Sequence, residues 1–426
     1  MEIKELLEHI EQGKFDNRLI DIYIDRERLD YQRERYIKAI KKFEQHYGAG
    51  NVQIFSAPGR SEIGGNHTDH QQGEVLAAAI NLDAIAVVRK HKEDEVCIIS
   101  GNARENRVDL KDLSVKESEY GTTKALIKGV LAGFVEREYS IGGFQAYITS
   151  DVLVGSGMSS SAAFETLIGV ILSGLYNDLS ITDVDIAIIG QYAENKYFGK
   201  PCGLMDQMAC SVGSLVHIDF KNLKAPVIEK ISFDMEQFGY SLCITDTKGS
   251  HADLTDEYAA VPAEMKQVAN YFGKEVLVDV TMKELLCEIM NIRKNLSDRC
   301  VLRALHFLNE NERVKKEVEA LKKEDMSTFL SLVTSSGNSS YKYLQNVYTN
   351  KDVAHQNVSL ALALSEIFLD GKGACRVHGG GFAGTIQTFV KNEDVNVYQK
   401  YMDDVFGAGA CNVLKIRKYG GIQIVV

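Results

Sequence analysis

Three short stretches of the chain combine glycine with residue types that can do chemistry. The first, GRSEIGGNHTDH (residues 59–70), carries an arginine, an aspartate, two histidines and three glycines, but only one large apolar side chain. It has too little apolar surface for a core strand and more ionisable groups than a linker needs. Glycine beside ionisable groups predicts a backbone that comes close to something polar.

The second stretch, GSGMSSSAAF (residues 155–164), predicts an anion-binding loop followed by a helix. Its glycines allow successive backbone N–H groups to point at a phosphate, and the helix adds partial positive charge at its N-terminus. Its serine hydroxyls can bond phosphate oxygens or occupy one position on a bound Mg²⁺. A plain serine-capped helix after a flexible turn is the alternative, and the loop alone leaves it open.

The third stretch, KPCGLMDQMACSVG (residues 200–213), places Asp206 among apolar and small residues. A buried aspartate is costly unless something pairs with it, so a helix cap or a structural ion pair is one interpretation. The functional interpretation is a carboxylate that accepts or orients a substrate hydroxyl, with Arg60 as the opposing cation on a transferring phosphoryl group. Glu194 is then a candidate oxygen ligand for Mg²⁺.

These stretches must be positioned by strands and helices that the apolar pattern also predicts. Residues 52–58, 75–90 and 144–152 have strand-like patterns, and the serine-rich loop opens a long apolar helix. Residues 1–46 predict a helical extension whose charge run, DRERLDYQRER, is interpreted as a solvated helix face. We place a domain boundary near Lys230, beyond which charged helices alternate with strands.

Bulk composition excludes several classes of function. A chain of 426 residues predicts two domains, and its formal net charge of −11 argues against a nucleic-acid partner. No apolar run is long enough to cross a bilayer, and the first residues lack the apolar core of a signal peptide. The eight cysteines show no paired spacing and predict reduced thiols, so we expect a cytoplasmic protein without a membrane partner.

Taken together, the motifs resemble those of the GHMP small-molecule kinases, and within them the galactokinases. Residues 56–80 resemble the sugar-binding signature, VGSGMSSSAA the ATP loop, AENKYFGKPCGLMDQ the segment with the catalytic aspartate, and HGGGFAGTIQTFV the C-terminal glycine motif. The resemblance implies an α/β and α+β two-domain fold with the active site between the domains. Residues 47–230 would form a ribosomal-protein-S5-like domain and residues 231–426 a ferredoxin-like domain.

The resemblance also implies an activity, the ATP-dependent phosphorylation of a hexose at C1, most simply galactose to galactose 1-phosphate, with ATP and Mg²⁺ as cofactors. It implies that Asp206 acts on the C1 hydroxyl and that Arg60 lies close to it. The implied binding residues are, for the sugar, Asn66, His67, Asp69, Gly203 and Tyr258; for ATP, Gly155, Gly157, Ser159, Ser160, Ser161 and Ala162; and for Mg²⁺, Ser161 and Glu194.

The first motif departs from the usual family pattern, and the departures keep alternatives open. Glu62, Gly64, Asn66 and His70 replace the usual Asn, Ile, Glu and Tyr. Because the family glutamate accepts a hydrogen bond from the C6 hydroxyl and Asn66 can also donate, galacturonate is an alternative substrate.

Two further alternatives belong to other classes. One is a non-catalytic sensor that binds sugar and ATP, although this chain keeps the Ser-Ser-Ala segment, Asp206 and Arg60. The other takes His67, Asp69 and His70 as metal ligands. Protein partners are not indicated by the sequence.

Overall fold

The computed structural model of the chain describes residues 1–152, 157–223, 225–249, 254–382 and 384–425. Its larger sheet is built around two long antiparallel strands, β1 (Gln53–Gly64) and β2 (Glu74–Lys90). The strand order is β12-β1-β2-β5-β3-β4, and the first half of β2 also pairs with β6, which pairs with β7. The other strands of this sheet are β3 (Glu95–Ser100), β4 (Asn106–Asp109), β5 (Phe144–Ser150), β6 (Leu215–Asp219), β7 (Val227–Ile231) and β12 (Ile422–Val425).

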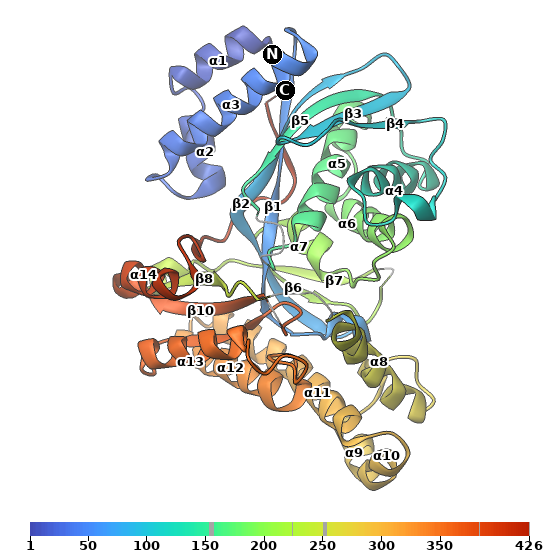
Figure 1. Cartoon of the computed structure of the whole chain (residues 1–426), viewed down its shortest axis with the longest axis vertical. Helices are drawn as coiled ribbons and strands as arrows, with labels where there is room; N and C mark the ends of the chain where they lie inside the picture. Colours follow the sequence, from blue (N-terminus) through green and yellow to red (C-terminus); the bar gives the residue numbers. More distant parts are fainter. Residues whose placement is uncertain (153–156, 224, 250–253, 383, 426) are drawn as a thin grey trace.

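Helices cover both faces of the upper part of this sheet (Figure 1). One face carries the N-terminal helices, where Ile85 and Val87 of β2 join their apolar core. The other face carries α4, α5 and α6, and there Ala86 and Val88 join a second core. Because both faces are buried, β2 is a nearly continuous apolar run instead of an alternating one. These helices are α1 (Ile3–Glu11), α2 (Asp16–Tyr23), α3 (Leu29–Tyr47), α4 (Thr123–Glu136), α5 (Ser160–Tyr176) and α6 (Asp183–Tyr192).

The predicted N-terminal helices are present, but the interpretation of their charge run as a solvated face is wrong for Arg35. The Arg35 side chain is only 6% exposed, and its Nη1 donates to Asp83 Oδ1 at 2.7 Å. Asp83 is fully buried in β2 and also accepts from Tyr23 at 2.8 Å and from Arg417 at 3.0 Å. The extension is therefore pinned to the sheet by a buried polar network as well as by apolar contacts.

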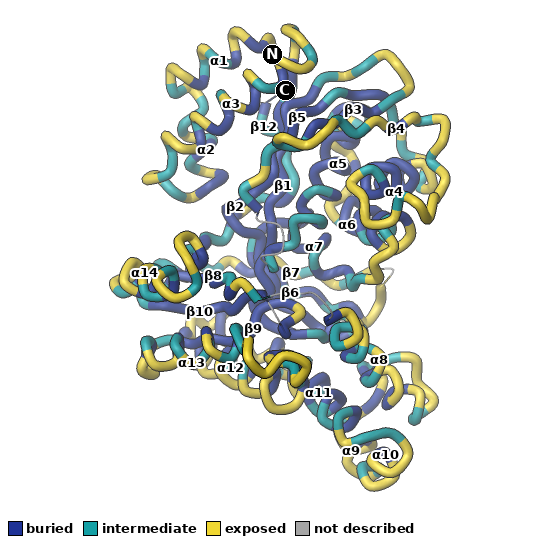
Figure 2. Tube along the Cα trace, viewed as in Figure 1, coloured by how far each residue is buried: buried dark blue, intermediate teal, exposed yellow. Residues whose placement is uncertain are grey.

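The second sheet is antiparallel, with strand order β11-β8-β10-β9, and helices pack around it. Its strands are β8 (Tyr240–Asp246), β9 (Ala374–His378), β10 (Thr385–Lys391) and β11 (Cys411–Leu414). The helices that follow β8 in the chain are α8 (Thr255–Tyr271), α9 (Met282–Cys287), α10 (Ile289–Asn295), α11 (Asp298–Lys322), α12 (Met326–Ser339), α13 (Asn357–Leu369) and α14 (Val395–Phe406). Figure 2 shows that the strands of both sheets are largely buried, while α9 and α10 form an exposed projection.

The chain passes from the first sheet to the second between β7 and β8. The boundary expected near Lys230 falls at the end of β7, and the second sheet begins at Tyr240. The chain then departs from the predicted partition, because β12 returns to pair with β1 of the first sheet. A further bridge joins Ile80 of β2 to Ile416.

Two broader expectations can be compared with the described residues. All eight cysteines are free thiols, as predicted. Among the helices of the described ranges, none has the length and apolar character needed to span a bilayer.

Candidate active site

Asp206 and Arg60 form a two-point ion pair between α7 (Met205–Val212) and β1. Arg60 Nε donates to Asp206 Oδ1 at 2.7 Å, and Arg60 Nη2 donates to Oδ2 at 2.8 Å. Arg60 Nη1 donates to the Gly157 carbonyl, and the Ser159 hydroxyl donates to Asp206 Oδ2. The structure thus brings together the predicted aspartate, the predicted cation and the serine-rich loop.

Asp206 remains accessible although it is paired. Its side chain is 31% exposed, whereas that of Arg60 is 7% exposed. Burial raises the pKa of Asp206, but the charge of Arg60 and the hydrogen bonds from Arg60 and Ser159 outweigh burial and lower the pKa below its ordinary value. At neutral pH this group is a carboxylate that can accept a hydrogen bond from a hydroxyl.

The serine-rich loop leads into the N-terminus of α5, as predicted. Ser160, Ser161 and Ala162 form the first turn, whose backbone N–H groups have no acceptor inside the helix. Gly157 has a positive φ of 70°, and a Cβ there would lie 2.5 Å from the Thr385 hydroxyl, so no side chain fits. Gly155 lies outside the described residues. The described part of the loop offers amide and hydroxyl donors beside Asp206, as a phosphate site requires.

Glu194 lies beside this turn in the short helical segment Ala193–Phe198. Its carboxylate, 3% exposed, accepts from the Ser161 hydroxyl at 3.2 Å and from Lys200 Nζ at 3.0 Å on the same oxygen, Oε1. Gln207 Nε2 donates to the other oxygen at 2.8 Å. Mg²⁺ prefers hard oxygen ligands, so the neighbouring Ser161 hydroxyl and Glu194 carboxylate fit the ion expected from the sequence.

The Asn66 side chain is not accessible to a sugar, although the sequence analysis expected it to be. Its side chain is fully buried, and Nδ2 donates to Glu62 Oε1 at 3.0 Å and to the Gly379 carbonyl at 2.8 Å. Its Oδ1 accepts from Ser340 at 3.2 Å and from Asn346 at 2.8 Å. The amide is saturated by protein groups, so the expectation of an Asn66–sugar contact is corrected. The galacturonate hypothesis, which depended on that contact, loses its basis.

Asp69 and Gly203 connect the first motif with the aspartate segment. A Cβ on Gly203 would lie 1.8 Å from Asp69 Oδ2, so only glycine allows Asp69 to approach the loop before α7. Gly203 stands three positions before Asp206. The close contact therefore places Asp69 next to the loop that leads to Asp206.

His67 and Tyr258 both contact the glycine-rich turn after β9. His67 has a positive φ of 59°, and its Nε2 lies 3.2 Å from the Gly380 carbonyl. The Tyr258 hydroxyl donates to the Gly381 carbonyl at 2.8 Å. Burial lowers the pKa of His67 to about 3, so its ring is neutral and its Nε2–H donates to Gly380.

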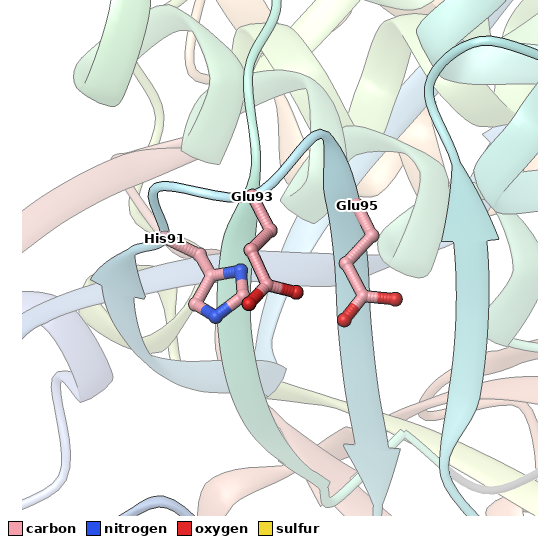
Figure 3. A group of neighbouring side chains, drawn as sticks. All are labelled: His91, Glu93 and Glu95. Atoms are coloured by element: carbon pink, nitrogen blue, oxygen red, sulfur yellow. The ribbon is translucent and has the colours of Figure 1, made fainter.

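The metal hypothesis for the first motif finds no support in this geometry. His67 directs Nε2 to a carbonyl, and His70 Nε2 lies 3.8 Å from Asp69 Oδ1. Within the described ranges, the His/Cys/Asp/Glu side chains close enough to share an ion are His91, Glu93 and Glu95, at the turn between β2 and β3 (Figure 3). Glu95 is already paired with Arg107 at 3.2 Å. These three residues follow the C-terminal end of β2, whereas the first motif precedes its N-terminal end.

Several buried polar residues that hold the first motif escaped the sequence analysis. Glu62 pairs with Arg376 of β9, and His378 Nε2 accepts from the Glu62 backbone N–H at 3.1 Å. On α11, Glu310 accepts from the N–H of Gly65 at 3.3 Å. The helix itself was predicted, and the signal that could have revealed its buried polar face is the spacing of four residues, Arg303, His306, Glu310 and Glu317.

Comparisons with known proteins agree with this arrangement. Residues 41–90 match the model described as the galactokinase galactose-binding signature, and residues 125–214 match the GHMP kinases N terminal domain. The galactokinase of Glaesserella parasuis serovar 5 is 33% identical over 366 residues, which cover 84% of this chain and 90% of that protein. The galactokinase of Actinobacillus pleuropneumoniae serotype 3 is 32% identical over 373 residues, covering 86% and 92%.

Solved structures show the same fold. The Lactococcus lactis galactokinase complexed with galactose superposes with a TM-score of 0.77 at 23% identity, covering 90% of this chain and 98% of that one. The Methanococcus jannaschii mevalonate kinase gives a TM-score of 0.61 at 17% identity, covering 86% and 99%. The two-sheet architecture is thus that of the GHMP kinases.

Proposed function

The chain belongs to the galactokinase family of the GHMP kinases, and from that premise we propose that it transfers a phosphoryl group from ATP to the C1 hydroxyl of galactose. The observation that carries the proposal is the meeting of Asp206, Arg60 and Ser159 at the N-terminus of α5. A carboxylate that can receive a hydroxyl lies there beside donors that can receive phosphate.

The sugar is held by the first motif and its neighbours. Asp69 accepts hydrogen bonds from ring hydroxyls, and Gly203 keeps the facing loop close enough for the sugar to reach Asp206. His67 and Tyr258 line the same side of the proposed sugar site, since both form hydrogen bonds with carbonyl groups of the 379–381 turn. Sugar hydroxyls need such fixed donors and acceptors, because an unpaired polar group in the site would cost affinity.

Transfer is a displacement at phosphorus. Asp206 accepts a hydrogen bond from the C1 hydroxyl and orients its oxygen toward the γ-phosphorus. The new O–P bond forms while the bond between the γ-phosphorus and the bridging oxygen breaks, and ADP leaves. The lowered pKa makes Asp206 a weak base. The proton of the C1 hydroxyl therefore passes to Asp206 only when the bond between the C1 oxygen and phosphorus is largely formed and the hydroxyl has become more acidic.

Charge on the phosphates is balanced by groups that are already in place. The first-turn amides of α5 at Ser160, Ser161 and Ala162 donate to phosphate oxygens, and Arg60 faces the transferring group. Ser161 and Glu194 would hold Mg²⁺, which when bound neutralises part of the phosphate charge. We place the protein in the cytoplasm, where ATP is available and free thiols persist.

Coupled measurement of ADP release tests this function. We expect turnover that depends on sugar, with galactose giving the highest kcat/KM in a panel of galactose, galacturonate, N-acetylgalactosamine, arabinose and glucose. Phosphorus NMR of the product should place the phosphate on C1. The same ADP release with and without galactose would identify a sensor or an ATPase instead, and faster turnover of galacturonate would refute galactose as the substrate.

A further inference from the structure

Lys200 is a cation in the candidate active site to which the proposed mechanism gives no role. It lies between the segment Ala193–Phe198, which carries Glu194, and α7, which carries Asp206. Gly199 ends the helical segment with a positive φ of 79°, and the Lys200 backbone N–H donates to the Glu194 carbonyl at 3.2 Å. Pro201 follows and restricts the backbone of Lys200 to extended conformations. The turn therefore fixes the backbone from which the Lys200 side chain extends.

The ammonium group is linked through the Glu194 carboxylate to the first turn of α5, the predicted phosphate site. Lys200 Nζ lies 3.0 Å from Glu194 Oε1, the oxygen that also accepts from the Ser161 hydroxyl at 3.2 Å. Ser161 belongs to the first turn of α5, whose N–H groups are available to an anion. A phosphate bound at this turn would be within reach of the Lys200 side chain, which has four rotatable bonds.

The two cations of the site, Arg60 and Lys200, differ in exposure and in the number of groups with which they already pair. Arg60 is 7% exposed and uses its three nitrogens on Asp206 and the Gly157 carbonyl. Lys200 is 62% exposed and makes one ion pair, with Glu194. A long, exposed lysine can change partners at small cost, whereas a buried bidentate arginine cannot.

The local charge balance favours a phosphate-binding role. Asp206 and Glu194 are two carboxylates beside the site that would receive the several negative charges of ATP. Lys200, an exposed ammonium paired with Glu194, supplies a positive charge at this place.

We propose that Lys200 binds the phosphate chain of the nucleotide directly, moving from Glu194 onto phosphate oxygens. This inference rests on the proposed kinase function and adds a cation to its nucleotide site. No bond is made or broken by Lys200. Its contribution is a charge-assisted hydrogen bond, N⁺–H to phosphate oxygen, of the kind that lysines make as point charges.

Binding of ADP in the presence of EDTA, measured by calorimetry, tests this role without Mg²⁺ and without turnover. We expect Lys200→Met to weaken ADP binding by about tenfold, the size of one charge-assisted contact in a solvent-exposed site. Lys196→Met is the matched control, because Lys196 pairs with Glu136 at 3.3 Å and both side chains are 51% exposed. The control should bind ADP like the wild type.

A double-mutant cycle separates direct contact from simple neutralisation of Glu194. In a Glu194→Gln background, Lys200→Met should still weaken ADP binding by about tenfold, since the phosphate contact does not need the carboxylate. If the effect disappears in that background, Lys200 acts only as the counter-ion of Glu194 and the proposal is overturned. An unchanged affinity in the single variant would overturn it too. Neither result bears on galactose-dependent ADP release by the wild type, which tests the kinase function separately.

Discussion

At the scale of single residues, the ion pair of Asp206 with Arg60 could be anticipated, whereas the environment of Asn66 could not. An aspartate among apolar residues needs a partner, and that requirement pointed to Arg60. The groups that saturate Asn66 come from Ser340, Asn346 and Gly379, far along the chain. Residue type indicates what a side chain can donate or accept, but only tertiary packing decides which partner it finds.

Glu317 of α11 is a second residue whose state depends on packing. It is fully buried against the first motif, and a Cβ on Gly64 would lie 1.9 Å from Glu317 Oε2. Within the described residues neither carboxyl oxygen has a hydrogen-bond partner. Burial and repulsion from Glu310 raise the pKa of Glu317 to about 8, although Arg376 and Arg313 oppose the shift. Glycine at position 64 thus makes room for a neutral carboxylic acid.

The raised pKa predicts that stability falls as the pH rises. In the unfolded chain a glutamate titrates near 4.5, so between pH 4.5 and about 8 the folded protein holds a proton that the unfolded chain has lost. Glu317→Gln removes this proton difference and should raise the free energy of unfolding at pH 8.5 by about 2–4 kcal/mol, with little effect at pH 4.5. Urea denaturation of both proteins at several pH values measures this difference in the free energy of unfolding.

The control for this prediction lies on the same helix. Glu319 is 67% exposed, and Glu319→Gln should leave the pH dependence of the wild type unchanged. A Glu317→Gln protein that loses stability between pH 5 and 8.5 as steeply as the wild type would show that Glu317 is already ionised in the fold.

At the scale of elements, the strands and helices with strong apolar patterns were predicted well. The strands β2 and β5 lie close to the expected residues, and α5 follows the serine-rich loop. The expectation for β1 was wrong beyond residue 58, because this strand continues to Gly64 and is buried there, although residues 59–64 have few apolar side chains. The N-terminal helices were predicted, but their contact with the sheet was not, because a charged run on a helix is most often solvated. The buried contact depends on Asp83 of β2, which is distant from α3 in the sequence and pairs with Arg35 only in the folded chain.

The contact of α3 with the sheet should contribute measurably to stability. Arg35→Met leaves the buried Asp83 carboxylate without one of its two arginine partners, so we expect the free energy of unfolding to fall by about 3 kcal/mol. Arg26→Met, an exposed change in the same charge run, should stay within about 0.5 kcal/mol of the wild type. Equal stabilities for the two variants, measured by urea denaturation, would contradict the buried pairing.

At the scale of the whole molecule, the proposed active site is assembled from segments that are distant in the sequence. Arg60, Ser159 and Asp206 meet at one place, and the turn at residues 379–381 closes the first motif. Motif order indicated that these segments belong to one site. The return of β12 to β1 was not predicted, because strand pairing across the full length of the chain leaves no local pattern.

The two halves of the molecule are joined by a buried polar contact near the site. Glu62 of β1 pairs with Arg376 of β9, so the first motif is fixed to the second sheet. Such a pair positions groups even where its net contribution to stability is small. We therefore attribute catalysis to the positioning of the sugar hydroxyl and the phosphate by rigid elements of both sheets.

The most direct test of the account is galactose-dependent ADP release by Asp206→Asn, measured beside galactose binding by calorimetry. Asparagine keeps the size of the side chain but cannot take up the hydroxyl proton. We predict that kcat falls by about a thousandfold, while the dissociation constant for galactose changes by no more than a few fold. A variant that keeps kcat within a few fold of the wild type would contradict the role given to Asp206.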